Sequence, residues 1–187
     1  MSYKDEIIDY NLHQEEIDKW ISLKGEQKYM RFVALLRQNN VDVKWNVLKD
    51  IYRYDKRLLV NLFKYLSFFE EFLRAQIWNV SRESYETLAQ AYLPQIIDHL
   101  ISLKNNICCK EFSINNLSTN KNYIVELRNR VSHNKIILES TKNGCNINQM
   151  LVAFRNTLPL TYQNGFVKDI NACTINLKIP KQLIINI

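Results

Sequence analysis

The chain has 187 residues, of which 47% are hydrophobic, so it can bury the core of one domain and is not a disordered chain. Glycine and proline occur only 3 times each, which argues against an all-β protein with many tight turns and favours helices. The formal net charge of +6 favours a polyanionic partner without identifying one.

The N-terminal segment is charged throughout and has no apolar core of a signal peptide. No stretch approaches the ~18 apolar residues of a membrane span, so we expect a cytoplasmic protein with no membrane partner. The cysteines are Cys108, Cys109, Cys145 and Cys173, and none of them forms the C-x-x-C spacing of zinc or redox sites. We predict four reduced thiols and no metal.

Residues 15–36 are predicted to form two short helices broken at Gly25. Residues 44–79 have helical periodicity almost throughout, with a break expected near Tyr54-Asp55. Five aromatic residues of this stretch occur at helical spacing and are predicted to be core rather than a base-stacking platform: Phe63, Phe68, Phe69, Phe72 and Trp78.

Residues 84–103 continue as an amphipathic helix that Pro94 either kinks or restarts. Residues 105–120 are polar and predict a loop. Ser118 or Thr119 is expected to cap the following helix, which runs to about His133.

A further helix is predicted over residues 148–158. Residues 174–187 alternate like a strand, which Pro180 restricts to an edge or a docked arm. These elements predict an all-α helical bundle, with an N-terminal helical appendage over residues 1–54 and a helical core with a C-terminal tail over residues 55–187.

The segment Leu127–Asn134 contains an R-N-x-x-x-H motif formed by Arg128 and His133. This motif resembles the R-x4-6-H signature of HEPN ribonucleases. Upstream, residues 70–77 read E-x-x-L-R-x-x-I and resemble the first core helix of Abi-like (abortive infection) proteins of that group. The order of the two motifs is that of the family, and the resemblance covers roughly residues 55–158.

The resemblance implies a HEPN-type helical bundle that acts as an endoribonuclease in anti-phage abortive infection or in a toxin–antitoxin system. It implies that Arg128 and His133 are catalytic and that a homodimer lines one cleft with two copies of the motif. The implied partners are an RNA substrate and a neutralising protein or RNA antitoxin. A tyrosine that the family often has two positions after the histidine is Lys135 here, so neutralisation by modification of that tyrosine is not expected.

The chemistry suits these residue types. Attack of a ribose 2′-hydroxyl on the adjacent phosphate needs a proton acceptor near pH 7, which histidine supplies, and a fixed cation for the developing charge, which arginine supplies. No cofactor is then required, and the product is a 2′,3′-cyclic phosphate. The two residues are five positions apart, so on a regular helix their side chains diverge by about 140°.

Supporting roles are predicted for neighbouring residues. Asn129 is expected to position the site, and Arg130 and Lys135 to hold flanking RNA phosphates. One of three residues on the upstream helix is expected to orient Arg128 or His133, with a solvated ion pair as the alternative: Glu70, Glu71 and Arg74.

Three alternatives remain open at this stage. Arg128 and His133 can be a helix-terminal surface residue and a helix cap. The chain can also be a HEPN-like bundle that binds RNA or protein without cutting. Lastly, the basic stretch 41–57 can belong to a DNA-binding regulator, although no recognition face is evident.

Overall fold

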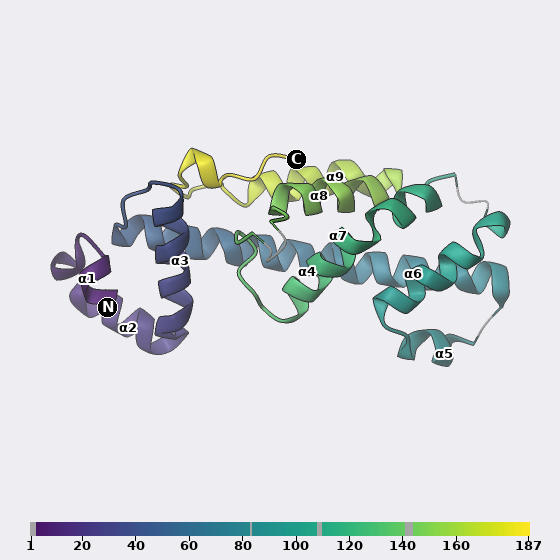
Figure 1. Cartoon of the computed structure of the whole chain (residues 1–187), viewed down its shortest axis with the longest axis horizontal. Coiled ribbons are helices and arrows are strands. Elements are labelled where there is room, and N and C mark those ends of the chain that lie inside the picture. The colour runs from purple at the N-terminus through teal and green to yellow at the C-terminus, as the bar shows by residue number, and fades with distance from the viewer. Residues whose placement is uncertain (1–2, 83, 108–109, 141–143) are drawn as a thin grey trace. The chain divides into compact units, whose positions relative to one another are not determined.

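The computed structural model describes residues 3–82, 84–107, 110–140 and 144–187 (Figure 1). Throughout these ranges the regular structure is helical and no strand occurs, so the predicted all-α class is confirmed. The α-helices are α1 Tyr3–Glu6, α2 Gln14–Lys24, α3 Glu26–Gln38, α4 Trp45–Ser81, α5 Tyr85–Gln90, α6 Leu93–Ser102, α7 Ile114–Ser132, α8 Ile147–Thr157 and α9 Leu160–Ala172. Short 3-10 helices cover Tyr10–Leu12, Lys104–Asn106 and Lys181–Leu183.

The chain divides into two compact units. The first, the N-terminal unit, contains Met1–Arg57 and Cys173–Ile184, and the second, the core unit, contains Leu58–Ala172 and Ile185–Ile187. The predicted appendage over residues 1–54 ends close to this boundary. The C-terminal tail, in contrast, was predicted with the core and lies mostly in the N-terminal unit.

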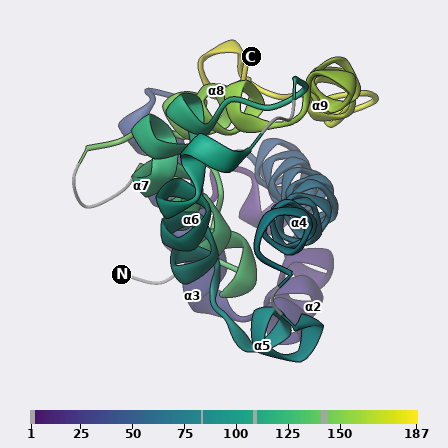
Figure 2. The same cartoon turned by 90° about the vertical axis from the view of Figure 1, so that its right-hand side faces the viewer.

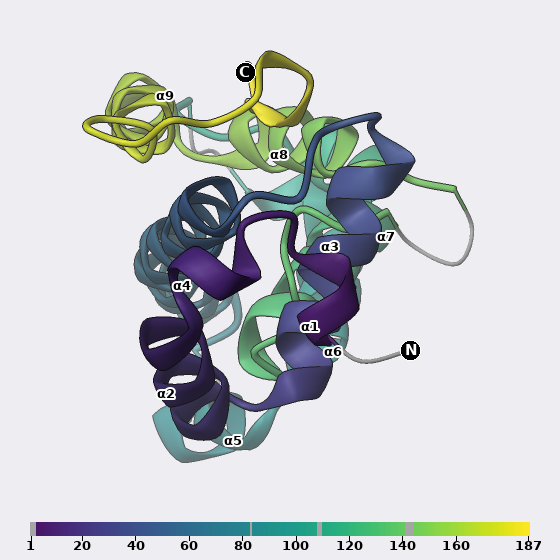
Figure 3. The same cartoon turned by 90° about the vertical axis from the view of Figure 1, so that its left-hand side faces the viewer.

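The N-terminal unit is built around aromatic side chains. Within it, α1 and α2 both lie beside α3 (Figure 3). Gly25 separates α2 from α3, as predicted, with a φ of 89° that a residue with a side chain rarely adopts. The rings of Tyr29 and Tyr52 stack with centroids 5.5 Å apart, and Trp45 packs against Tyr29 at 6.0 Å. These contacts join α3 to the beginning of α4.

The tail is held by side chains of α4 rather than by a sheet. Arg57 donates hydrogen bonds to the carbonyls of Cys173 and Ile175, at 3.2 and 2.6 Å, and the Lys178 amide donates to Asp50 at 3.0 Å. No strand forms among the described residues of the tail. Of the two predicted possibilities, an edge strand and a docked arm, the structure has the docked arm, an irregular segment held by hydrogen bonds to side chains.

The helix α4 runs without the predicted break at Tyr54-Asp55. Both residues are fully buried, and neither glycine nor proline interrupts the apolar stripe there. At the helix start, the Trp45 amide donates to the Asp9 carboxylate at 2.8 Å, which satisfies one of the unpaired N-terminal donors. As one unbroken helix, α4 has 37 residues, of which those up to Arg57 belong to the N-terminal unit and the rest to the core unit.

The core unit packs α7 against α6 and α8 (Figure 2). A chain of edge-to-face aromatic contacts crosses its interior: Phe69 of α4 meets Phe154 of α8 at 5.4 Å, and Phe154 meets Phe166 of α9 at 5.5 Å. The helix α9, which the sequence analysis did not predict, thereby closes the core over α4 and α8.

A polar contact also fixes α9 to α4. Asp169 accepts hydrogen bonds from the Lys64 ammonium at 2.8 Å and from the Tyr65 hydroxyl at 2.9 Å. The hydrogen bond from Lys64 holds the pKa of Asp169 below its usual value, with a further contribution from Tyr65. Burial and the same carboxylate raise the pKa of Tyr65 to about 12, so the phenol stays a donor to Asp169 at neutral pH.

The helix that carries the R-N-x-x-x-H motif begins earlier than predicted. Its cap is Ser113, whose hydroxyl accepts a hydrogen bond from the Asn116 amide at 3.2 Å. Residues 114–120 of the predicted loop therefore belong to α7. Pro94 restarts the chain as α6, near its first position, as one of the two predicted possibilities.

Candidate functional site

Arg128 lies on α7 and reaches the facing side of α4. Its Nε donates to Oε1 of Glu70 at 3.3 Å, and its side chain is 30% exposed. Among the described residues, its two terminal nitrogens have no hydrogen-bond partner. The carboxylate therefore holds the guanidinium from one side and leaves the outer edge of the fork available for an anion.

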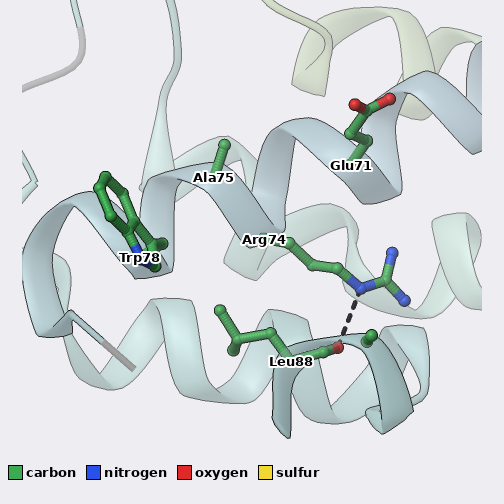
Figure 4. Close-up of a pocket in the computed structure, with 6 residues that line it drawn as sticks. Glu71, Arg74, Ala75, Trp78 and Leu88 are labelled. Carbon is green, nitrogen blue, oxygen red and sulfur yellow. Dashed lines mark hydrogen bonds between the residues drawn. The ribbon is translucent and has the colours of Figure 1, made fainter. Parts of the chain in front are cut away.

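Glu70 is shared between two arginines. Its other oxygen, Oε2, lies 3.5 Å from Nη2 of Arg74, one turn further along α4. Arg74 also donates to two backbone carbonyls of the α5 region, from Nε to Leu88 at 3.0 Å and from Nη2 to Ala91 at 3.2 Å (Figure 4). Arg74 thus ties α5 to α4. Glu70 makes the contact with Arg128 that a positioning role needs, and it also forms an i, i+4 ion pair with Arg74, the kind of pair given as the alternative. Glu71 is exposed and does not line the Arg128 cavity.

A cavity of about 310 Å³ opens beside Arg128. Side chains from α4 and α7 line it: Phe63, Leu66, Ser67, Glu70, Arg74, Arg128, Val131 and Ser132. Its polar groups are two arginines, one carboxylate and two hydroxyls, a set that can bind a phosphate group. The sequence analysis missed Ser67 and Ser132, because serines on helix faces carry no distinguishing pattern.

His133 stands where α7 ends. Asn134 adopts a left-handed conformation with φ of 50°, its amide donates to the Val131 carbonyl, and the Lys135 amide donates to the Arg130 carbonyl at 3.0 Å. This is the Schellman arrangement that terminates helices at an asparagine or glycine. The His133 side chain is consequently exposed and is not among the residues that line the Arg128 cavity.

Within one chain, Arg128 and His133 therefore do not lie in the same cavity. This agrees with the divergence that their spacing on a helix predicts. Asn129 is half-buried on α7, and Lys135 is exposed just beyond the helix end. Lys135 keeps the exposure that its predicted phosphate contact needs.

Arg130 is the residue whose predicted role does not fit its position. Its side chain is buried, with Nε bonded to Glu126 at 3.2 Å and Nη1 donating to the carbonyls of Ile136, Ile137 and Glu139. A guanidinium committed to these carbonyls is not exposed to a flanking phosphate. We therefore correct the assignment of Arg130 from RNA contact to structure: it holds the turn that follows His133.

The aromatic residues of α4 also differ from expectation. Phe69 is fully buried, as predicted, but Phe63 is 60% exposed and Trp78 is 47% exposed. The apolar stripe is wider than the surface that α7, α8 and α9 cover, so its margins remain in solvent. The assignment of these two rings to the core is wrong.

The cysteines and possible metal ligands in the described part of the chain do not form a second candidate site. Cys145 and Cys173 carry thiols, and Cys108 and Cys109 lie outside the described residues. Burial raises the pKa of the Cys145 thiol, which favours the less nucleophilic protonated form. No group of three or more metal-ligating side chains occurs in the described ranges, and no helix there is long and apolar enough to cross a membrane.

No family model, no curated protein and no solved structure matches this chain. The resemblance to HEPN proteins therefore rests on the two motifs and their order.

Proposed function

We propose that this protein is a metal-independent endoribonuclease of the HEPN type, acting in anti-phage abortive infection or as the toxin of a toxin–antitoxin system. The observation that carries the proposal is the state of Arg128. A carboxylate fixes its Nε at the wall of a cavity, while its terminal N–H groups have no partner among the described residues. In Arg130, by contrast, Nη1 is committed to backbone carbonyls.

The two motif residues then have complementary tasks. His133 removes the proton from a ribose 2′-hydroxyl, and the 2′-oxygen attacks the adjacent phosphorus. Arg128 donates hydrogen bonds to the nonbridging oxygens as negative charge develops on them. The bond from phosphorus to the 5′-oxygen breaks, the leaving oxygen takes up a proton, and a 2′,3′-cyclic phosphate remains.

This mechanism predicts that cleavage proceeds in the presence of a chelator. Total RNA incubated with the protein and excess EDTA should be cut at the same rate as without EDTA, because no step uses a metal-bound hydroxide. The new 3′ ends should resist a 3′-phosphatase until acid opens the cyclic phosphate. Activity that EDTA abolishes and magnesium restores would contradict the mechanism.

A second copy of the chain completes the site in this proposal. One chain holds Arg128 in its cavity and His133 outside it, and a C₂ dimer brings a second motif opposite the first. The second His133 also supplies the general acid that protonates the leaving oxygen.

The dimer predicts complementation between two inactive variants. Arg128→Ala and His133→Ala should each be inactive alone, yet a mixture should regain part of the activity, because a mixed dimer retains one arginine and one histidine as the general base but lacks the second histidine as the general acid. Exchange of subunits by brief dilution before the assay allows mixed dimers to form. A mixture as inactive as its components would show that each chain works alone.

A further inference from the structure

A second, larger cavity lies between α4 and α5. It encloses about 700 Å³ and is lined by Glu71, Arg74, Ala75, Trp78, Leu88 and Ala89 (Figure 4). This volume lies in the range of sites for small organic ligands. Its walls combine apolar side chains with one arginine, one glutamate and one large aromatic ring, which is the composition of a site for a flat, partly polar molecule.

Trp78 supplies the ring. The indole is 47% exposed, and the guanidinium of Arg82 lies over it at 4.5 Å from the ring centroid. Arg82 follows the end of α4 in a left-handed conformation with φ of 57°. An exposed indole with a guanidinium over one face can stack a nucleobase on its other face, and the guanidinium attracts the phosphates attached to that base.

The two cavities are neighbours along α4, because Arg74 lines both of them. Glu70 and Trp78 stand one helical turn to either side of Arg74, so about 12 Å of helix separates the carboxylate that holds Arg128 from the indole. A strand with its scissile phosphate at Arg128 can therefore place a nearby base against Trp78.

We propose that the cavity at Trp78 binds one unpaired nucleobase next to the scissile phosphate, with Trp78 as the stacking surface and Arg82 facing the adjoining backbone. This inference rests on the proposed ribonuclease function, whose substrate it restricts to RNA with an unpaired base at that position. A base inside a duplex is stacked on its neighbours and is not free to enter.

The test measures binding apart from cleavage. The probe is a fluorescein-labelled single-stranded oligonucleotide with 2′-O-methyl groups at every position, which lacks the attacking hydroxyl, and the readout is its anisotropy. Trp78→Ala should weaken binding about tenfold or more, since stacking of one base on an aromatic side chain contributes about that much. Trp78→Phe should keep most of the affinity. Tyr123→Ala is the matched control, because Tyr123 is a 37% exposed aromatic residue that lines a different hollow, between α7 and α8.

Tryptophan emission gives an independent readout. The oligonucleotide should quench the emission of the wild type, and the quenching should disappear in Trp78→Phe although binding persists. A duplex of the same sequence should bind the wild type and Trp78→Ala equally.

Three results would overturn the stacking site: no binding to the wild type, equal affinity of wild type and Trp78→Ala, or unchanged quenching in Trp78→Phe. Failure of the ribonuclease function has a different signature. It appears as cleavage that does not depend on His133, and it leaves the comparison of binding affinities intact.

Discussion

Replacing His133 with alanine should lower the rate of RNA cleavage by roughly 100-fold or more, the usual contribution of a general base. The folded state should lose little stability, because the side chain is exposed and the backbone of Asn134 and Lys135, not the imidazole, ends the helix. The measurement compares cleavage of total RNA with thermal unfolding of the same preparation. A large loss of activity at an unchanged melting temperature separates catalysis from folding.

Two matched variants sharpen this result. His13→Ala removes the same side chain from the N-terminal unit and should leave cleavage unchanged. Arg128→Ala should match His133→Ala, whereas Arg128→Lys should retain part of the activity, since an ammonium keeps the charge but lacks the planar fork. Full activity in His133→Ala would refute the assignment of the catalytic pair.

Arg130→Ala should differ from His133→Ala, because its first effect should be a loss of stability of the folded state. The buried guanidinium donates to the carbonyls of Ile136, Ile137 and Glu139, and its removal leaves these acceptors without their donor. We expect a loss of about 2–4 kcal/mol in the free energy of unfolding, from the cost of unpaired buried polar groups. For a chain of this size the melting temperature should fall by roughly 5–15 °C.

Hydrogen exchange locates the effect of Arg130→Ala. Amides of residues 135–139 should exchange faster in this variant, because the turn loses its support, whereas those of α8 should change less. Arg155→Ala is the control, since among the described residues the hydrogen bonds of the Arg155 side chain reach only the Asn156 side chain. An unchanged melting temperature in Arg130→Ala would contradict the structural role.

Local signals in the sequence predicted much of the fold. The scarcity of glycine and proline predicted helices, Gly25 marked the break between α2 and α3, and Pro94 marked the start of α6. Sequence signals failed where contacts between distant segments determine the local structure. The polar, asparagine-rich start of α7 has little helical periodicity, and the Ser113 cap and the packing of α7 against α6 and α8 stabilise it as a helix. The tail looked like a strand because alternation does not reveal that side chains of α4 hold its backbone.

The candidate site was predicted in part for a related reason. Glu70 and Arg128 are 58 residues apart, and the resemblance offered Glu70 only as one of three residues that could orient Arg128 or His133, with an ion pair as the alternative. The two arginines of the motif, in contrast, look alike in sequence. Arg128 and Arg130 face different sides of α7, and only the turn after the helix, whose carbonyls surround Arg130, distinguishes a structural guanidinium from one with exposed N–H groups.

The sharing of Glu70 also sets the electrostatic balance of the cavity. Two guanidinium groups and one carboxylate meet there, Oε1 facing Arg128 and Oε2 facing Arg74, so the cluster carries a net charge of about +1. A phosphodiester carries one negative charge, which balances the net positive charge of this cluster. Occupancy by one phosphate group should therefore release about one counterion, and the remaining salt dependence of RNA binding belongs to cations elsewhere on the surface.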